Sequence, residues 1–128
     1  MGRDCSVWYN AVIRGDVHSI TIGDRVNIQD NATIHATYKK APCKIGNRVS
    51  IAHNAVIHGC TIGNNVLVGI GAIILDDVVI EDNSIIAAGA VVTKGTIVES
   101  GSILDGASES EVLFADIPFM KSSFASVK

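Results

Sequence analysis

Three of the four histidines lie in one stretch of the chain and follow the same six-residue hydrophobic rhythm. His35 comes directly after Ile34 and His58 directly after Ile57, whereas His53 comes two residues after such a repeated position. Imidazole is a common ligand of zinc and of other first-row metals. Three imidazoles held by one rigid framework leave an open coordination position for water. The stretch therefore predicts a metal centre.

The rhythm that places these histidines extends over most of the chain. Every repeated position is Ile or Val, and a small or β-branched residue stands two places before it. A period of six does not fit an amphipathic helix, but it fits a short strand and a tight corner stacked as a solenoid. The repeated positions are Ile22, Ile28, Ile34, Ile45, Ile51, Ile57, Ile62, Val68, Ile74, Ile80, Ile86, Val92 and Val98.

The hexad resembles the repeat of the hexapeptide-repeat proteins. This resemblance implies an all-β fold, a left-handed parallel β-helix in which three hexads make one triangular coil. The left-handed winding is an exception to the usual crossover rule and rests on the resemblance, because a sequence period does not fix the hand. Each strand should pair with a strand one coil away, at about 4.8 Å.

Interruptions of the rhythm decide which histidines meet. The step from Ile34 to Ile45 is 11 residues, which predicts a loop within residues 36–42 at one corner. With that loop set aside, the repeated positions before His35 and His58 are one full coil apart. The two histidines should stack and point outward, where both could bind one metal at about 2.0–2.1 Å.

His53 is expected on a different edge, because the five residues that separate it from His58 span about 16 Å of extended strand. If the metal hypothesis is right, the third ligand comes from a neighbouring chain, and three-fold packing of triangular prisms would place it there. The alternative is that these histidines are solvated surface residues. His18 has no partner in the rhythm and is expected to be an ordinary surface residue.

Length and composition limit the other possibilities. The chain has 128 residues, which suggests one domain. We expect a solenoid over residues 1–106 that begins within the repeats, and a short irregular or helical tail over residues 107–128. The net charge of −3 gives no basic footprint for nucleic acid. No apolar run reaches the roughly 18 residues of a membrane span, and no signal peptide pattern is present.

Cysteine usage favours a reducing compartment. The three cysteines Cys5, Cys43 and Cys60 are an odd number and lie far apart in the sequence, which argues against a disulfide framework. All three occupy the small position of the hexad, so we expect them to be buried. Packing is likewise the expectation for Trp8 and Tyr9 at a corner. The predicted location is cytoplasmic.

Two runs of sequence, IRGDVHSITIGDRVNIQDNATIH and IAHNAVIHGCTIGNNVLVGIGA, resemble the γ-class carbonic anhydrases and their close bacterial relatives. The resemblance covers about residues 6–101. It implies reversible hydration of CO2 to bicarbonate by a metal-bound hydroxide, in a homotrimer whose metal sites lie between subunits. It assigns His35 and His58 of one subunit and His53 of the next as ligands of Zn2+ or Fe2+.

The same resemblance gives roles to four further residues. Gln29 would orient the metal-bound water, with Asp30 beside it, while Arg14 and Asp16 would form subunit contacts and a wall of the site. The loop of residues 36–44 carries lysines and no carboxylate, so the chain resembles the subclass without the acidic loop. The family's first repeats would lie upstream of Met1, and the run SILDGASESEV differs from the usual C-terminal pattern.

Two other functions are compatible with the sequence. Hexapeptide β-helices often carry an acyltransferase that uses a single histidine as general base, since a fold does not fix a function. That hypothesis explains one histidine but not a stacked pair. The chain could also be a non-catalytic metal-binding or assembly subunit of the carbonic anhydrase family.

Overall fold

The computed structural model describes residues 1–105, which form a parallel β-helix. The predicted all-β fold is confirmed, and the left-handed winding stays an expectation of the resemblance. The predicted tail over residues 107–128 lies outside the described residues. Within residues 1–105 the structure holds no helix that could cross a membrane.

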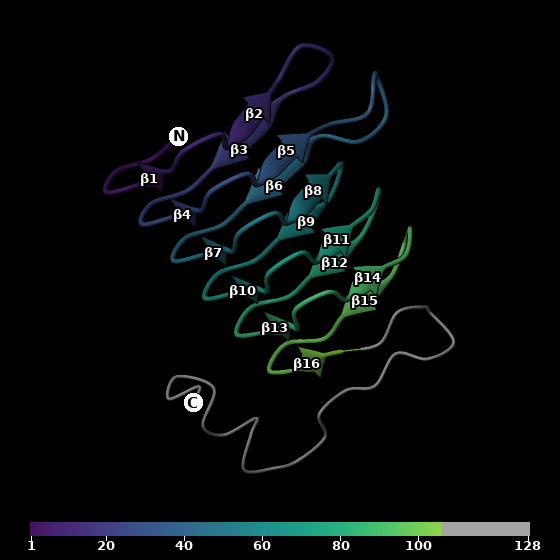
Figure 1. The fold of residues 1–128 in the computed structure, drawn as a ribbon. Coiled ribbons are helices and arrows are strands. Elements are labelled where there is room, and N and C mark those ends of the chain that lie inside the picture. The colour runs from purple at the N-terminus through teal and green to yellow at the C-terminus, as the bar shows by residue number, and fades with distance from the viewer. Residues whose placement is uncertain (106–128) are drawn as a thin grey trace.

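Within residues 1–105, sixteen short strands form three sheets; each of five coils contributes one strand to each sheet, and β16 begins a sixth coil (Figure 1). All strand pairs are parallel and in register, one coil apart. Sheet A contains β1 (Ser6–Val7), β4 (Asn27–Ile28), β7 (Ser50–Ile51), β10 (Leu67–Val68), β13 (Ile85–Ile86) and β16 (Ile103–Leu104). Sheet B contains β2 (Val12–Arg14), β5 (Thr33–His35), β8 (Val56–His58), β11 (Ile73–Ile74) and β14 (Val91–Val92). Sheet C contains β3 (Ile20–Ile22), β6 (Cys43–Ile45), β9 (Thr61–Ile62), β12 (Val79–Ile80) and β15 (Ile97–Val98).

The repeated positions form the core, as the rhythm predicts. All thirteen lie inside the solenoid, none of them more than 5% exposed. The small positions face the same interior, where Cys43 and Cys60 are buried. Cys5 is only partly buried, because its coil is stacked against another on one side alone.

The corner between sheets A and B is built from residues that tolerate a left-handed backbone. Asn31 and Asn54 have φ of 62° and 60° there, a conformation that asparagine adopts more readily than most residues. Their amides bond the coil before: the Asn54 N–H donates to the Asp30 carbonyl, N to O 3.0 Å. The next amide in this column, that of Gly71, donates to the carbonyl of His53 at 2.9 Å. The corner that carries His53 is therefore fixed by bonds on both sides.

The interruption after Ile34 is a corner loop, as predicted. The loop connects β5 to β6 and closes on itself through an antiparallel bridge between Thr37 and Ala41. The Thr37 N–H donates to the Ala41 carbonyl, N to O 3.0 Å. Because the loop leaves and re-enters at the same corner, β5 and β8 pair in register despite the extra residues.

The hydrophobic register can be tested with one pair of substitutions. Ile74 is fully buried, whereas the neighbouring strand residue Val79 points outward and is 36% exposed. Ile74→Asp buries a carboxylate without a partner, so we expect a loss of about 4 kcal/mol or more in the free energy of unfolding. Val79→Asp should cost about 1 kcal/mol or less. Thermal unfolding followed by circular dichroism measures both, and equal damage would contradict the register.

Candidate metal centre

His35 and His58 face each other at the carboxyl ends of β5 and β8. They are direct partners in the parallel register, so their side chains leave the same face of sheet B one coil apart. The Nδ1 atom of His35 lies 3.1 Å from the Nε2 atom of His58. The ring centroids are 5.1 Å apart and the ring planes meet at 61°. The predicted stacking of the two histidines is confirmed.

A carboxylate holds the far nitrogen of each ring. Asp16 Oδ1 lies 3.0 Å from His35 Nε2, and Asp76 Oδ1 lies 2.5 Å from His58 Nδ1. An ionised carboxylate only accepts, so each of these ring nitrogens carries the proton. In neutral rings the two inner nitrogens are then both acceptors, and their lone pairs point toward each other. Such an arrangement is repulsive unless a proton or a cation lies between them.

The distance between the inner nitrogens suits a shared proton and also suits a bound metal ion. Two ligands at about 2.0–2.1 Å from a tetrahedral ion are about 3.3 Å apart, close to the observed 3.1 Å. Carboxylates on the outer nitrogens of ligating histidines are the usual supporting groups of such sites. The residues present therefore fit a metal such as zinc.

Arg14 and Asp16 lie beside His35 and brace it from the coil before. Arg14 Nη1 donates to Asp16 Oδ2 at 2.6 Å, while the other oxygen of Asp16 contacts His35. The hydrogen bond with His35 lowers the pKa of Asp16 below its ordinary value, and the guanidinium of Arg14 adds to this effect. The carboxylate is therefore ionised, as the proton placement on His35 requires.

The sequence analysis missed Asp76 and Thr37, which hold His58. Thr37 Oγ1 donates to Asp76 Oδ2 at 2.5 Å, and Asp76 Oδ1 contacts His58. Burial alone would raise the pKa of Asp76, but the hydrogen bonds from Thr37 and His58 outweigh it and lower the pKa. The signal in the sequence was a corner acid just past the strand one coil after His58: β8 and β11 pair with an offset of 17 residues, and Asp76 follows His58 by 18.

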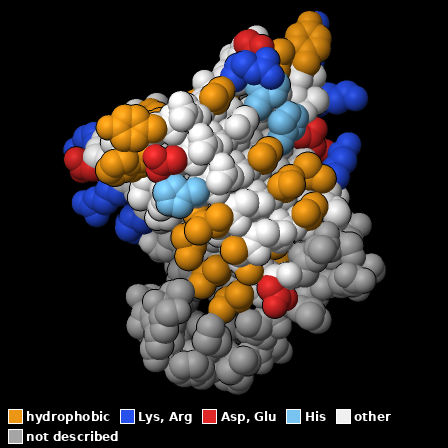
Figure 2. Space-filling view, viewed as in Figure 1, with side chains coloured by type: hydrophobic (Ala, Val, Ile, Leu, Met, Phe, Trp, Pro, Cys, Tyr) orange, Lys and Arg blue, Asp and Glu red, His pale blue; other side chains and the backbone are white. Residues whose placement is uncertain are grey.

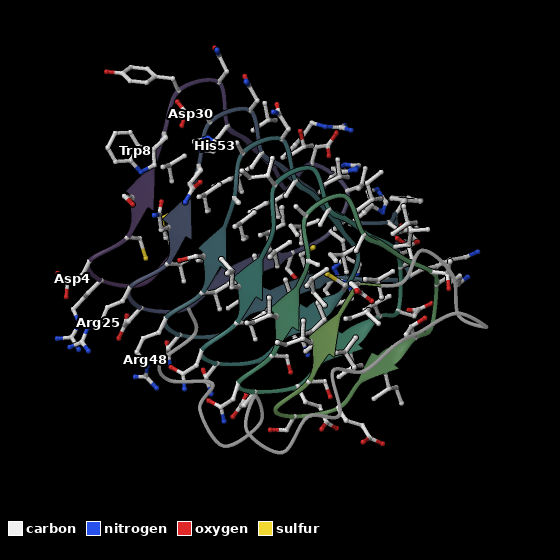
Figure 3. All side chains as sticks on the ribbon, turned by 60° about the horizontal axis from the view of Figure 1, so that its bottom comes forward. Asp4, Trp8, Arg25, Asp30, Arg48 and His53 are labelled. Carbon is white, nitrogen blue, oxygen red and sulfur yellow. The ribbon has the colours of Figure 1, made fainter. Side chains whose placement is uncertain are left out.

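His53 lies apart from this pair, on the corner between sheets A and B. Its Nδ1 is 3.1 Å from Asp30 Oδ2, and about half of its side chain is exposed. His53 and Asp30 line a shallow depression of about 270 Å³ together with Trp8, Asn27 and Gln29. In Figure 3 the labelled side chains of Trp8, Asp30 and His53 gather at one edge of the solenoid. Gln29 and Asp30 thus accompany His53, whereas Arg14 and Asp16 accompany His35.

The histidines thus form two groups on the surface. Figure 2 shows histidine side chains in separate places on one face, with hydrophobic side chains near both. Over residues 1–105, no three His, Cys, Asp or Glu side chains of a single chain are arranged to hold a metal ion. One chain supplies two converging imidazoles and, on another corner, a third.

The expectation that Trp8 and Tyr9 are packed is wrong. Trp8 is 50% exposed and Tyr9 is 76% exposed. Both lie in the corner between β1 and β2, where the chain turns outside the core. Ile70, at the same corner three coils on, is 55% exposed. The edge that carries His53 is therefore lined by large apolar side chains that this chain leaves uncovered.

Comparisons with known proteins agree with this fold and these motifs. Residues 59–94 match the bacterial transferase hexapeptide family (six repeats). Gamma carbonic anhydrase 2, mitochondrial, of Arabidopsis thaliana is 42% identical over 84 residues, which cover 62% of this chain and 30% of that protein. Carbonic anhydrase of Geobacillus kaustophilus is 40% identical over 76 residues, which cover 59% of this chain and 41% of that protein.

A solved structure extends the likeness over nearly the whole chain. A hexapeptide transferase family protein from Anaplasma phagocytophilum aligns with a TM-score of 0.80 and 37% identity, and the alignment covers 98% of this chain and 75% of that chain. Fold and repeat together define a hexapeptide-repeat protein. The chain belongs to this family, and its sequence relatives include the γ-class carbonic anhydrases. The chain spans less than half the length of the two curated relatives.

The tautomers of the two facing histidines can be measured. The contacts require the proton of His58 on Nδ1 and that of His35 on Nε2. We expect nitrogen-15 spectra of the metal-free protein near pH 8 to show these two different tautomers. His18 is a reference, since neither carboxylate contacts it. A His58 ring protonated on Nε2 would contradict the geometry.

Proposed function

We propose that this chain is a γ-carbonic-anhydrase-like metalloprotein that hydrates CO2 reversibly to bicarbonate and a proton. In this proposal the site lies between the subunits of a homotrimer and holds Zn2+ or Fe2+. The observation that carries it is the pair of inner nitrogens on His35 and His58, 3.1 Å apart, whose lone pairs converge. The similarity to the γ-class carbonic anhydrases of Arabidopsis thaliana and Geobacillus kaustophilus supports it.

The proposed ligands are His35 and His58 from one subunit and His53 from its neighbour. Asp30 contacts Nδ1 of His53 at 3.1 Å, which leaves Nε2 of that ring for the metal. Each of the three imidazoles then has one carboxylate behind it and one nitrogen directed to the ion. Two imidazoles alone would be a weak site, and the third completes a set that leaves one position open.

A bound zinc or ferrous ion would act as the Lewis acid that makes water nucleophilic at neutral pH, as is established for carbonic anhydrases themselves. Gln29 lines the same depression as His53, so its amide is available to hold the attacking water in place. Asp16, fixed by Arg14, keeps the His35 ring oriented. Trp8 supplies apolar wall beside the depression, which suits a nonpolar substrate such as CO2.

The uncovered apolar edge supports the subunit arrangement. Trp8, Tyr9 and Ile70 are each at least half exposed on the corner that carries His53. Val12, on the outer face of sheet B, is 47% exposed. Packing the corner of one subunit against sheet B of the next would cover these side chains and would bring His53 to the His35–His58 pair.

Two alternatives remain distinct from this proposal. A hexapeptide transferase would use His58 as general base, and its contact with Asp76 resembles the support of such a base. That function leaves the facing His35 without a role, and acyl-CoA turnover in a metal-free protein would favour it. A non-catalytic metal-binding or assembly subunit would bind the metal yet hydrate no CO2.

Metal content and CO2 hydration, measured on the same anaerobically purified sample, test the proposal. His35→Ala, His53→Ala and His58→Ala should each lose nearly all bound metal and all hydration activity, because each removes one of three ligands. His18→Ala is the matched control and should keep both. Gln29→Ala should keep the metal and lose rate. If the His53→Ala variant contained as much metal as the parent, the three-ligand site would be refuted.

A mixture of two inactive variants tests whether the site is shared. Homotrimers of His53→Ala or of His58→Ala alone should lack a complete site. After joint unfolding and refolding in equal amounts, about one quarter of the interfaces should join an intact His35–His58 pair to an intact His53 of the neighbour. Metal binding and hydration should return to that extent.

The mixture distinguishes two arrangements of the ligands. If all three imidazoles came from one chain, no mixture of these variants could rebuild a site. Mass spectrometry of the refolded oligomers shows whether both variants are present in one assembly. Mixed oligomers that recover no metal would refute the intersubunit arrangement.

A further inference from the structure

We infer that Asp76, seated by Thr37 and Gly59, is a positioning residue that fixes His58 for metal binding and sets its spacing from His35. This inference rests on the proposed metal site and assigns a role to three residues that the family resemblance did not supply. None of the three touches the position between the two inner nitrogens. Their effect on the metal therefore runs through His58.

Gly59 lies one coil before Asp76 and packs against its carboxylate. In the parallel register Gly59 is stacked on Asp76, because Ile57 pairs with Ile74 two residues earlier. A Cβ atom on Gly59 would lie 2.6 Å from Asp76 Oδ1 and 3.0 Å from the Cβ of Ala41. Gly59 also has a φ of +55°, a left-handed conformation that glycine adopts without steric cost. Because Gly59 has no side chain, the Asp76 carboxylate can occupy this space beside His58.

Thr37 binds the other oxygen of the Asp76 carboxylate. Its hydroxyl donates to Asp76 Oδ2 at 2.5 Å, so both carboxylate oxygens are bound and the group cannot rotate freely. Thr37 follows His35 by two residues in the same corner loop. One hydrogen-bonded chain thus runs from the loop after His35, through Asp76, to the ring of His58, and it joins three successive coils.

This chain of contacts favours metal binding in two ways. The carboxylate keeps the proton of His58 on Nδ1, so the lone pair of Nε2 is free and directed at the partner ring. It also makes the imidazole a stronger donor to a cation. Because the same network reaches the loop that follows His35, it holds the two rings at one separation.

The chain offers a matched pair of substitutions for the test. Asp76→Asn keeps the shape of the side chain but removes its charge. Asp77→Asn removes the same charge one residue away, where the carboxylate is more than half exposed and pairs with Lys94 at 3.8 Å. Asp77 has a φ of 61°, which asparagine tolerates well. Thr37→Val removes the hydroxyl at constant volume, and Thr37→Ser restores it.

Zn2+ affinity of the oligomeric full-length chain, measured by competition with a chromogenic chelator, is the main readout. We expect Asp76→Asn to weaken zinc binding about 10- to 100-fold, Thr37→Val to weaken it less, and Asp77→Asn and Thr37→Ser to bind like the parent. Substituted Co2+ should show a changed visible spectrum only in Asp76→Asn and Thr37→Val. The melting temperature of the metal-free forms should stay within a few degrees of the parent.

The outcomes separate this inference from the proposed function. A parent chain that binds neither Zn2+ nor, under anaerobic conditions, Fe2+ would refute the metal site itself. A parent that binds Zn2+, with Asp76→Asn binding it equally well and with the same Co2+ spectrum, would overturn the positioning role and leave the metal site standing. Equal weakening in Asp76→Asn and Asp77→Asn would also overturn it, because the effect would then be one of general charge.

Discussion

Stacking in register is the constraint on which the rest of this structure depends. Each coil repeats the path of the one before, and every strand bonds the strand one coil away through its backbone. A side chain therefore meets the residue at the same position of the next coil, whatever its type. Inside, this places Ile on Ile and fills the core; outside, it places His35 on His58. The same rule that builds the core thus brings together the two histidines that we propose as ligands.

Stacking also explains why one chain does not assemble the whole site. His53 and His58 stand at opposite ends of β8, so both adjoin sheet B but on different corners. Nothing in the solenoid can fold one corner onto the other, because each is bonded to the coils above and below. A site that needs all three rings must take the third from another molecule. The rigidity that positions two ligands therefore makes an assembly the natural way to obtain the third.

The fold and the histidine pair could be predicted from the sequence because both depend on the spacing of the repeated hydrophobic positions. Once the 11-residue step after Ile34 was understood as a corner loop, the rhythm alone placed His35 on His58. That spacing does not predict which side chains contact each other across a corner. Asp76 lies at a position where the coil before carries Gly59 and the coil after carries Lys94, so only the structure shows that its carboxylate turns toward His58. The expectation that Trp8 and Tyr9 are packed was wrong for a related reason. The hydrophobicity of a residue does not distinguish a buried corner from a subunit surface.

The three histidines share one local plan although they come from different corners. His35 contacts Asp16, His53 contacts Asp30 and His58 contacts Asp76, each through a single ring nitrogen. A surface histidine does not require a carboxylate partner, and a carboxylate on one nitrogen of each of the three rings is what the proposed metal site would need. His18 differs, because among residues 1–105 its ring hydrogen-bonds the neighbouring Ser19 and no carboxylate. The common feature of the candidate ligands is therefore the acid behind each ring, and that feature separates them from the fourth histidine more sharply than their spacing does.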